Sequence, residues 1–235
     1  MDRTDMLELS REFSSLAEQI AGTGGGAAPA HRVVDLAVKS VEGCRWATIT
    51  TLRGKHSQLL AASDKAAEQL ERAQNELGEG PTADVARLDE NLAVTDLERD
   101  TRWPRFAPFA VRAAGVTSVR AYRLAGSHPT VLTLWGAGPG DESGAAADHF
   151  AGQASTLVAL IAATEQAANL QTALQSSREI GMALGILMAH RKITSDDAFD
   201  LLRTASQNLH RKLRDVALEV MDTGTLPDGP RRPQD

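Results

Sequence analysis

The hydrophobic pattern of the chain changes its period near residue 143. Before that point, residues 44–51 alternate with the two-residue period of a strand, and stretches with helical spacing lie on both sides. After about residue 175 only helical spacing remains. The chain is therefore neither all-helical nor all-sheet. The pattern predicts the α+β class, with antiparallel hairpins and helices interleaved, followed by a purely helical region.

The same reading gives the individual elements before that helical region. Strands are expected at residues 44–51, 57–62, 91–95, 116–124 and 130–135. Helices are expected at residues 4–20, 30–42, 66–77 and 104–114, and a long one from about 143 towards 175, with its continuation into the next helix left open. Gly78 and Gly80 are expected to end the helix at 66–77, and Gly115 the helix at 104–114. The segment 22–29 holds three consecutive glycines and a proline, which predicts a flexible linker rather than a phosphate loop, because no strand precedes it.

Three helices are expected after residue 175, at 176–190, from Thr194 to about 207, and up to 222. Thr194 with Asp197 forms a Thr-x-x-Asp variant of the capping box at the start of the second helix. Asn208 is expected to cap the third helix, and Gly224 to end it. The chain is thereby divided into residues 1–29 (helix and linker), 30–165 (sheet domain), 166–224 (helical domain with its connecting helix) and 225–235 (disordered tail).

Composition excludes several classes of protein. Net charge is −6, so a uniformly basic nucleic-acid coat is ruled out, and the single cysteine rules out an internal disulfide and a multi-cysteine metal site. Aromatic residues are only 4% of the chain, which disfavours the stacking platforms of single-strand binders. Neither a signal peptide nor a membrane span is expected, since the longest apolar stretch, residues 157–163, is too short. We therefore expect a cytoplasmic protein without membrane contact.

Positive charge gathers in the helical region. Residues 176–215 hold seven Lys or Arg against five Asp or Glu, a net of +2, so the rest of the chain carries −8. Five of these cations flank the second helix: Arg191, Lys192, Arg211, Lys212 and Arg214. The last three lie off the apolar stripe of the third helix and are expected to face outward. Two interpretations stay open at this point, a solvated helix face and a surface that binds a polyanion.

No catalytic constellation is visible in the sequence. The six histidines make no metalloprotease motif, and no Gly-x-Ser-x-Gly elbow is present. Cys44, at the start of a strand, is expected to be a small core residue rather than a nucleophile. We therefore expect no enzyme activity, no catalytic residues, no bound metal and no cofactor.

Four segments of the helical region resemble the ANTAR domain, the RNA-binding output module of bacterial transcription antitermination regulators. They are Ile180-Gly181-Met182-Ala183-Leu184-Gly185-Ile186-Leu187-Met188, Asp197-Ala198-Phe199-Asp200-Leu201-Leu202-Arg203, Ala205-Ser206-Gln207-Asn208, and Arg211-Lys212-Leu213-Arg214-Asp215-Val216-Ala217. The resemblance spans roughly residues 172–222 and implies an all-α three-helix domain. It also implies a partner, namely paired RNA stem-loops in leader transcripts. Binding of these stem-loops by the domain stabilises an antiterminator hairpin.

The resemblance also places the RNA contacts. They fall at the end of the second helix and the start of the third, with one more cation before the second: Arg203, Ser206, Gln207, Asn208, Arg211, Lys212 and Arg191. Leu184 stands where the family usually has Lys, which removes a cation and puts an apolar group on the outer side of the first helix. Phe199, the one aromatic of the region, is expected in the core because of its spacing to Leu202. Recognition should then rest on charge and hydrogen bonds rather than on base stacking.

The middle of the chain is similar, more loosely, to a GAF domain, a central antiparallel sheet flanked by helices. The matching pieces are Gly80-Pro81, residues 94–106, residues 115–119 and residues 132–135. The family often has Gly-Pro-Cys where this chain has Gly80-Pro81-Thr82. The resemblance implies a sensor or dimerisation domain that receives a small-molecule or protein signal, without naming the ligand.

Together these observations predict an RNA-binding antitermination regulator in which the GAF-like domain controls the ANTAR domain. The alternative is a protein-interaction or dimerisation module whose helical tail no longer binds RNA. A homodimer is expected in the first case, because tandem stem-loops favour a two-headed protein. The connecting helix carries Leu157, Leu160, Ile161, Leu170 and Leu174, mostly at spacings of 3 or 4. This stripe either packs on the sheet or forms a helix–helix seam.

Overall fold

The structure, a computed structural model, describes residues 3–23, 27–54, 56–126, 128–136 and 144–227. The chain divides into two compact units, Met1–Gln166 and Ala167–Asp235. The boundary falls inside one continuous helix, α6 (Gly144–Arg191), so the long helix expected from about 143 continues through the helix expected at 176–190. The centre of the predicted glycine linker, and the predicted tail from residue 228 on, lie outside the described residues. No described helix is both long enough and apolar enough to span a membrane.

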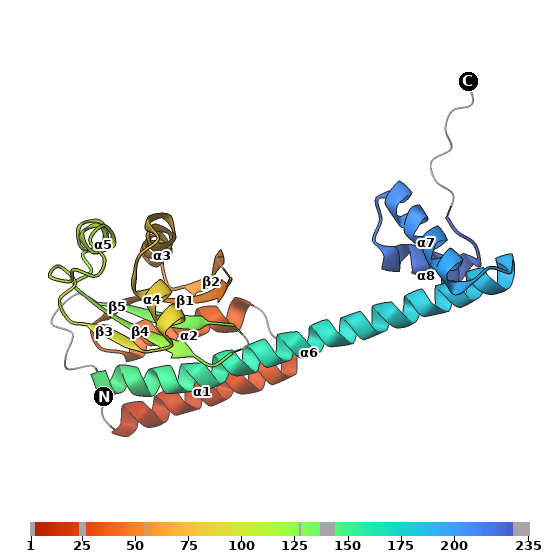
Figure 1. The fold of residues 1–235 in the computed structure, drawn as a ribbon. Helices are drawn as coiled ribbons and strands as arrows, with labels where there is room; N and C mark the ends of the chain where they lie inside the picture. The colour runs from red at the N-terminus through yellow and green to blue at the C-terminus, as the bar shows by residue number, and fades with distance from the viewer. Residues whose placement is uncertain (1–2, 24–26, 55, 127, 137–143, 228–235) are drawn as a thin grey trace. The chain divides into compact units, whose positions relative to one another are not determined.

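The first unit is built on a five-stranded antiparallel sheet in the order β2-β1-β5-β4-β3 (Figure 1). The strands are β1 (Cys44–Arg53), β2 (His56–Ala62), β3 (Leu92–Val94), β4 (Ser118–Leu124) and β5 (Thr130–Gly136). All five strands expected from the sequence are present. The central strand β5 is buried along its whole length, which fits its mostly apolar composition, broken only by Thr130 and Thr133.

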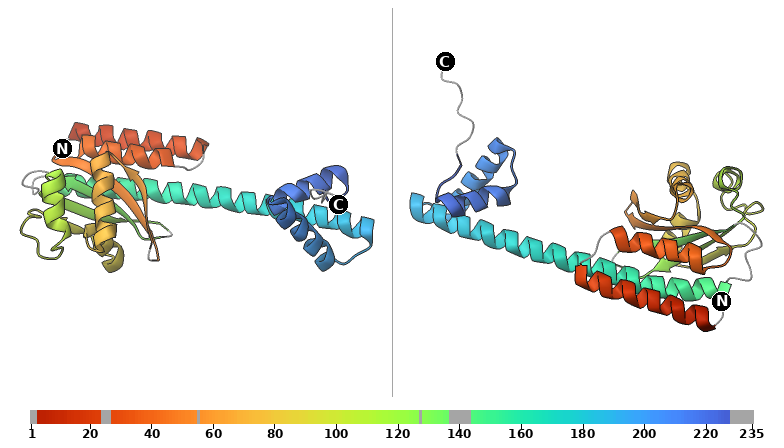
Figure 2. Two further views of the ribbon diagram at one scale, coloured as in Figure 1. Left: turned by 90° about the horizontal axis from the view of Figure 1, so that it is seen from above. Right: turned by 180° about the vertical axis from the view of Figure 1, so that it is seen from behind.

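One face of this sheet is covered by α1 (Arg3–Thr23), α2 (Ala27–Ser40) and the first part of α6 (Figures 1 and 2). Leu9, Phe13 and Leu16 of α1 are buried in the same core as the sheet. The rings of Phe13 and Phe150 meet edge to face with centroids 5.3 Å apart. The N-terminal helix, which the sequence analysis set apart with its linker, therefore packs as part of the sheet unit.

The other face carries α3 (Lys65–Leu77), α4 (Pro81–Leu88) and α5 (Phe106–Ala114). Gly78 and Gly115 end α3 and α5 in the left-handed conformation, as their sequence positions predicted. Helix α4 was not predicted, and α5 begins at Phe106 rather than at Pro104. Pro81 stands in the first turn of α4, where its missing N–H costs no hydrogen bond.

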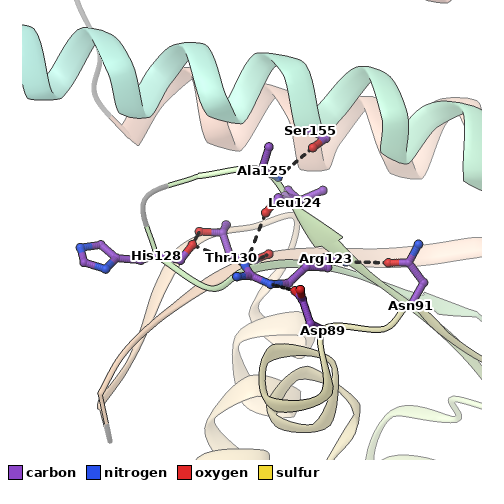
Figure 3. A network of polar contacts seen from close by, with 8 residues as sticks. All are labelled: Asp89, Asn91, Arg123, Leu124, Ala125, His128, Thr130 and Ser155. Carbon is purple, nitrogen blue, oxygen red and sulfur yellow. Dashed lines mark hydrogen bonds and ion pairs between the residues drawn. The ribbon is translucent and has the colours of Figure 1, made fainter.

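A network of polar contacts holds the hairpin between β4 and β5 (Figure 3). The Arg123 side chain is anchored on Asp89 at the end of α4, with 2.9 Å between Nε and Oδ1. Its backbone N–H donates to Asn91 Oδ1 at 2.9 Å. On the opposite side, the backbone N–H of Ala125 donates to the Ser155 hydroxyl of α6 at 2.8 Å. The hairpin is thus tied both to α4 and to the first part of α6.

Candidate nucleic-acid interface

The second unit contains the last part of α6 together with α7 (Ser195–Leu209) and α8 (Leu213–Thr223). Their shared core consists of small and branched aliphatic side chains: Ala183, Leu187, Ala198, Leu202, Val216, Ala217 and Val220. Small residues at the contact let the helices approach closely, and a core of this size is typical of a compact three-helix unit.

The start of α7 follows the sequence prediction. The Thr194 hydroxyl accepts a hydrogen bond from the backbone N–H of Asp197, and the Asp197 side chain accepts one from the backbone N–H of Thr194. This reciprocal capping satisfies two N–H groups that the first turn of a helix leaves unpaired.

The turn between α7 and α8 differs from the prediction. Asn208 lies inside α7 and does not cap α8; the residue at the N-cap of α8 is Lys212, with Arg211 before it. His210 adopts the left-handed conformation that ends α7. The Ser206 hydroxyl donates to the carbonyl of Arg211 at 2.6 Å, so Ser206 fixes the path of this turn. Tertiary packing, which sets where α8 begins, decided the cap here.

Most of the predicted contact residues are exposed, and most of them cluster. Arg203, Gln207 and Asn208 lie on the last turns of α7, and Arg211 and Lys212 on the turn that follows. Ser206, another of the predicted contact residues, is only partly exposed. Arg191 ends α6, before α7 begins. The 15 residues of α7 span about 22 Å, so Arg191 and the turn lie at opposite ends of this helix.

Three of the predicted cations are already paired with acids of the same unit. Arg203 contacts Asp200 at 2.8 Å, and Arg211 contacts Glu219 at 2.5 Å. Arg214, which was expected to face outward, lies against Glu179 of α6 at 2.6 Å. The other four Lys or Arg of residues 176–215 have no ion pair with a described residue: Arg178, Arg191, Lys192 and Lys212. The positive field at the end of α7 is therefore weaker than the count of cations suggests.

Two apolar residues also lie where the sequence did not place them. Phe199 is 38% exposed on α7 rather than buried beside Leu202. Leu184 is half-buried against the shared core of the three helices instead of standing on their outer side. Leu184 thus replaces the cation usual in the resemblance by a packing contact within the unit.

The sheet unit has a buried polar cluster that sequence reasoning missed. The Glu71 carboxyl of α3 accepts hydrogen bonds from the hydroxyls of Thr48, at 2.7 Å, and Thr82, at 2.9 Å. Gln74 donates to Thr82 Oγ1 and accepts from its backbone N–H, and Thr133 of β5 bonds the same hydroxyl at 3.0 Å. The one signal in the sequence was the replacement of the usual Cys by Thr at position 82.

Burial sets the chemistry of this cluster. The pKa of Glu71 is raised because the carboxyl is fully buried, and hydrogen bonds from neutral Thr and Gln side chains oppose that shift only in part. Trp135 lies two residues from Thr133 and so on the same sheet face, and its buried indole N–H has no hydrogen-bond partner among the described residues. A buried carboxyl on α3 and an indole N–H that is unpaired among the described residues, on the strand face that packs against α3 and α5, thus lie in this unit.

Cys44 is a half-buried thiol rather than an activated one. Burial raises its pKa to about 12, so almost no thiolate is present at neutral pH. Among the described residues, no group of three His, Cys, Asp or Glu side chains is arranged to hold a metal ion. At neutral pH the sheet unit therefore has no thiolate nucleophile at Cys44.

Comparison with known proteins assigns both units. Residues 168–221 match the family model of the ANTAR domain, and they include the second half of α6, all of α7 and most of α8. This chain therefore carries an ANTAR domain at these residues, as the sequence motifs predicted. No curated protein matches the chain.

The sheet unit matches solved GAF-domain structures. The GAF domain of an Acinetobacter phosphoenolpyruvate-protein phosphotransferase has a TM-score of 0.52 at 15% identity, covering 72% of this chain and 99% of that one. The GAF domain of a phosphoenolpyruvate-protein phosphotransferase from Coxiella burnetii has a TM-score of 0.50 at 14% identity, covering 74% of this chain and 99% of that one. At such low identity the likeness establishes the fold alone, which is GAF-like.

The same fold also occurs in an enzyme. Free methionine-R-sulfoxide reductase from Neisseria meningitidis, solved with its substrate, has a TM-score of 0.50 at 9% identity, covering 73% of this chain and 95% of that one. A GAF-like fold by itself therefore does not distinguish a sensor domain from a catalytic one.

Proposed function

We propose that this chain is an RNA-binding transcription antitermination regulator, in which the GAF-like unit controls the ANTAR domain. The observation that carries the proposal is the ANTAR match over residues 168–221. We propose that the RNA consists of tandem stem-loops in leader transcripts, and that the protein acts in the cytoplasm. The chain acts as a regulator rather than as an enzyme; the raised pKa of the Cys44 thiol supports this.

The proposed contact surface is the end of α7 and the turn into α8. Lys212 is exposed, has no ion pair with any residue that the structure describes, and makes no side-chain cap on the first turn of α8. The first N–H groups of a helix are good donors to phosphate, and a lysine beside them adds charge. Arg203, Gln207, Asn208 and Arg211 add donors on the same side of the turn. Ser206 acts by fixing the turn, and Arg191 extends the contact to the other end of α7.

Control by the GAF-like unit is proposed as a linkage. A small-molecule or protein signal that binds one conformation of that unit better than another shifts the population of the two. Helix α6 belongs to both units, so a change in its first part is carried by the same helix that forms the ANTAR core. We propose a homodimer as the species that binds paired stem-loops, because linked sites raise the effective concentration.

The proposal is tested with the full chain and a pool of RNAs that each contain two adjacent hairpins. The variant Arg211→Gln/Lys212→Gln removes two cations without adding repulsion to Glu219. We expect weaker binding, and a slope of log affinity against log salt that is smaller by about 2. The control Arg72→Gln/Arg99→Gln removes the same charge from exposed positions of the sheet unit and should leave binding unchanged. A parent chain that retains no RNA from the pool overturns the proposal.

One alternative is supported by a specific observation. Arg203, Arg211 and Arg214 are all engaged by acids, and Leu184 stands where a cation is usual. These features favour a helical protein-interaction module that no longer binds RNA. In that case the full chain binds a protein partner or a second copy, and its affinity for the hairpin pool is no greater than that of the double variant.

A further inference from the structure

Phe199 is exposed although the core of its unit is complete without it. Its neighbours Ala198 and Leu202 are fully buried and supply the contacts of α7 to α6 and α8. No other phenylalanine, tyrosine or tryptophan occurs between residues 167 and 235. Phe199, which is 38% exposed, is therefore the one phenylalanine, tyrosine or tryptophan on the outside of this unit.

The position of Phe199 on α7 relates it to the proposed contact surface. Arg203 and Gln207 follow it at spacings of four and eight residues, so the three side chains share one face of the helix. All three are exposed. The row is about 12 Å long, and it leads directly into the turn that carries Lys212.

The Phe199 ring, the Arg203 guanidinium and the Gln207 amide lie on one face of α7, and the Lys212 ammonium lies on the turn that follows. Together these groups fit an unpaired nucleotide. A base can stack on the ring, while the guanidinium and amide donate to its edge and the ammonium meets the phosphate. A paired base offers no free face for this, so the ligand belongs to the loop of a hairpin. We propose that Phe199 is the stacking platform for one unpaired loop base of the RNA. This inference rests on the proposed function and adds the residue that distinguishes a loop from a duplex.

The charges around Phe199 favour the base over the backbone at this point. Asp196 lies three residues before the ring, is exposed and has no ion pair with a described residue, whereas Asp200, one residue after the ring, is paired with Arg203. The Asp196 carboxylate so close to the ring repels phosphate. The sugar-phosphate chain therefore runs towards Lys212, and the base lies at the Phe199 end.

The test uses the full chain and one RNA that the parent chain binds from the pool of RNAs with two adjacent hairpins. Phe199→Ala and Phe199→Leu should each weaken binding by about 5- to 100-fold, because neither offers an aromatic face. Phe199→Tyr should bind as the parent does. Leu88→Ala, at an apolar position of the sheet unit that is 66% exposed, is the matched control and should have no effect. The helix content of every variant should equal that of the parent, since Phe199 is outside the core.

A double-mutant cycle, with one change in the protein and one in the RNA, identifies the stacked base. Each loop position is replaced in turn by an abasic nucleotide, and binding to the parent and to Phe199→Ala is measured. At the stacked position the two losses should not add, since each removes the same contact. Full additivity at every position overturns the inference, as does a Phe199→Ala chain that binds as tightly as the parent. A parent that binds no RNA overturns the proposed function itself. If Phe199→Ala loses self-association but keeps the RNA affinity of the parent, the ring belongs to a protein contact. That result also overturns the inference.

Discussion

Arg214 and Glu179 join α8 to α6 through two hydrogen bonds, 2.6 Å from Nε to Oε2 and 3.3 Å from Nη2 to Oε1. The Glu179 carboxylate is almost completely covered and also accepts from Gln175 at 2.7 Å. The Arg214 hydrogen bonds hold the pKa of Glu179 below its usual range. A cation that the sequence assigned to an outer surface is thus part of what holds the ANTAR helices together.

We expect Glu179→Gln to lower the melting temperature of the ANTAR unit more than Asp200→Asn does, since the latter removes the carboxylate from an exposed Arg pair. A lowered pKa means that the contribution of Glu179 is present above the usual glutamate range and is lost as the pH falls through the folded value. All three tryptophans lie in the sheet unit, so helix loss seen by circular dichroism without a change in tryptophan fluorescence reports this unit. Equal melting of both variants at pH 7 would contradict the assignment.

Glu71 should give the sheet unit the opposite pH dependence. Its pKa is raised in the folded chain, so its contribution is complete below the usual glutamate range and is lost as the pH rises through the folded value. We expect the urea midpoint of tryptophan fluorescence in the parent to fall as the pH is raised above the usual glutamate range. Glu71→Gln keeps the acceptor for Thr48 and Thr82 and cannot ionise, so its midpoint should vary less with pH. Glu90→Gln, at an exposed loop position, is the control and should follow the parent.

Gly80 cannot be replaced without disturbing the same cluster. Its φ is +146°, and a Cβ at this position would lie 2.3 Å from Oε1 of Gln74, which is held by the backbone N–H of Thr82. We expect Gly80→Ala to destabilise the sheet unit by about 1–3 kcal/mol. Gly152→Ala, inside α6 with nothing within 4 Å of its Cβ, should instead stabilise by about 0.5–1 kcal/mol. Urea denaturation followed by fluorescence compares the two, and effects of the same sign would refute the argument.

The leucine stripe of the connecting helix divides between two environments. Leu157 and Ile161 are buried in the sheet unit, whereas Leu170 and Leu174 are 57% and 72% exposed. We expect the latter two to lie in a helix–helix seam between two copies of the chain. Light scattering at tens of micromolar should show a dimer for the parent and a monomer for Leu170→Gln/Leu174→Gln. Leu88→Gln should remain dimeric, and a strictly monomeric parent would exclude the seam.

Local chemistry was enough to predict many elements of this fold. The alternation in residues 44–51 predicted β1, the Thr194–Asp197 pair predicted the start of α7, and Gly78 and Gly115 predicted two helix ends. Each of these depends on contacts within a few residues, such as a capping bond or a positive φ, which a sequence displays directly. The ANTAR motifs were likewise visible as a sequence pattern, and the family match confirms the domain.

Other features were set by partners far away in the sequence. Phe199 has the spacing of a core residue, yet Ala198 and Leu202 already fill the contacts to α6 and α8, so the ring is left outside. Asn208 is a good cap by type, but the packing of α8 places the cap at Lys212. Glu71 and Arg214 look like ordinary surface charges in the sequence, and their burial and pairing arise from strands and helices that lie 23 and 35 residues away. The sequence by itself determined the five strands, most of the helices and the ANTAR identity of residues 168–221, but not helix α4. The tertiary structure alone decided which side chains remain free to meet a ligand, because exposure and pairing depend on all the elements that pack together.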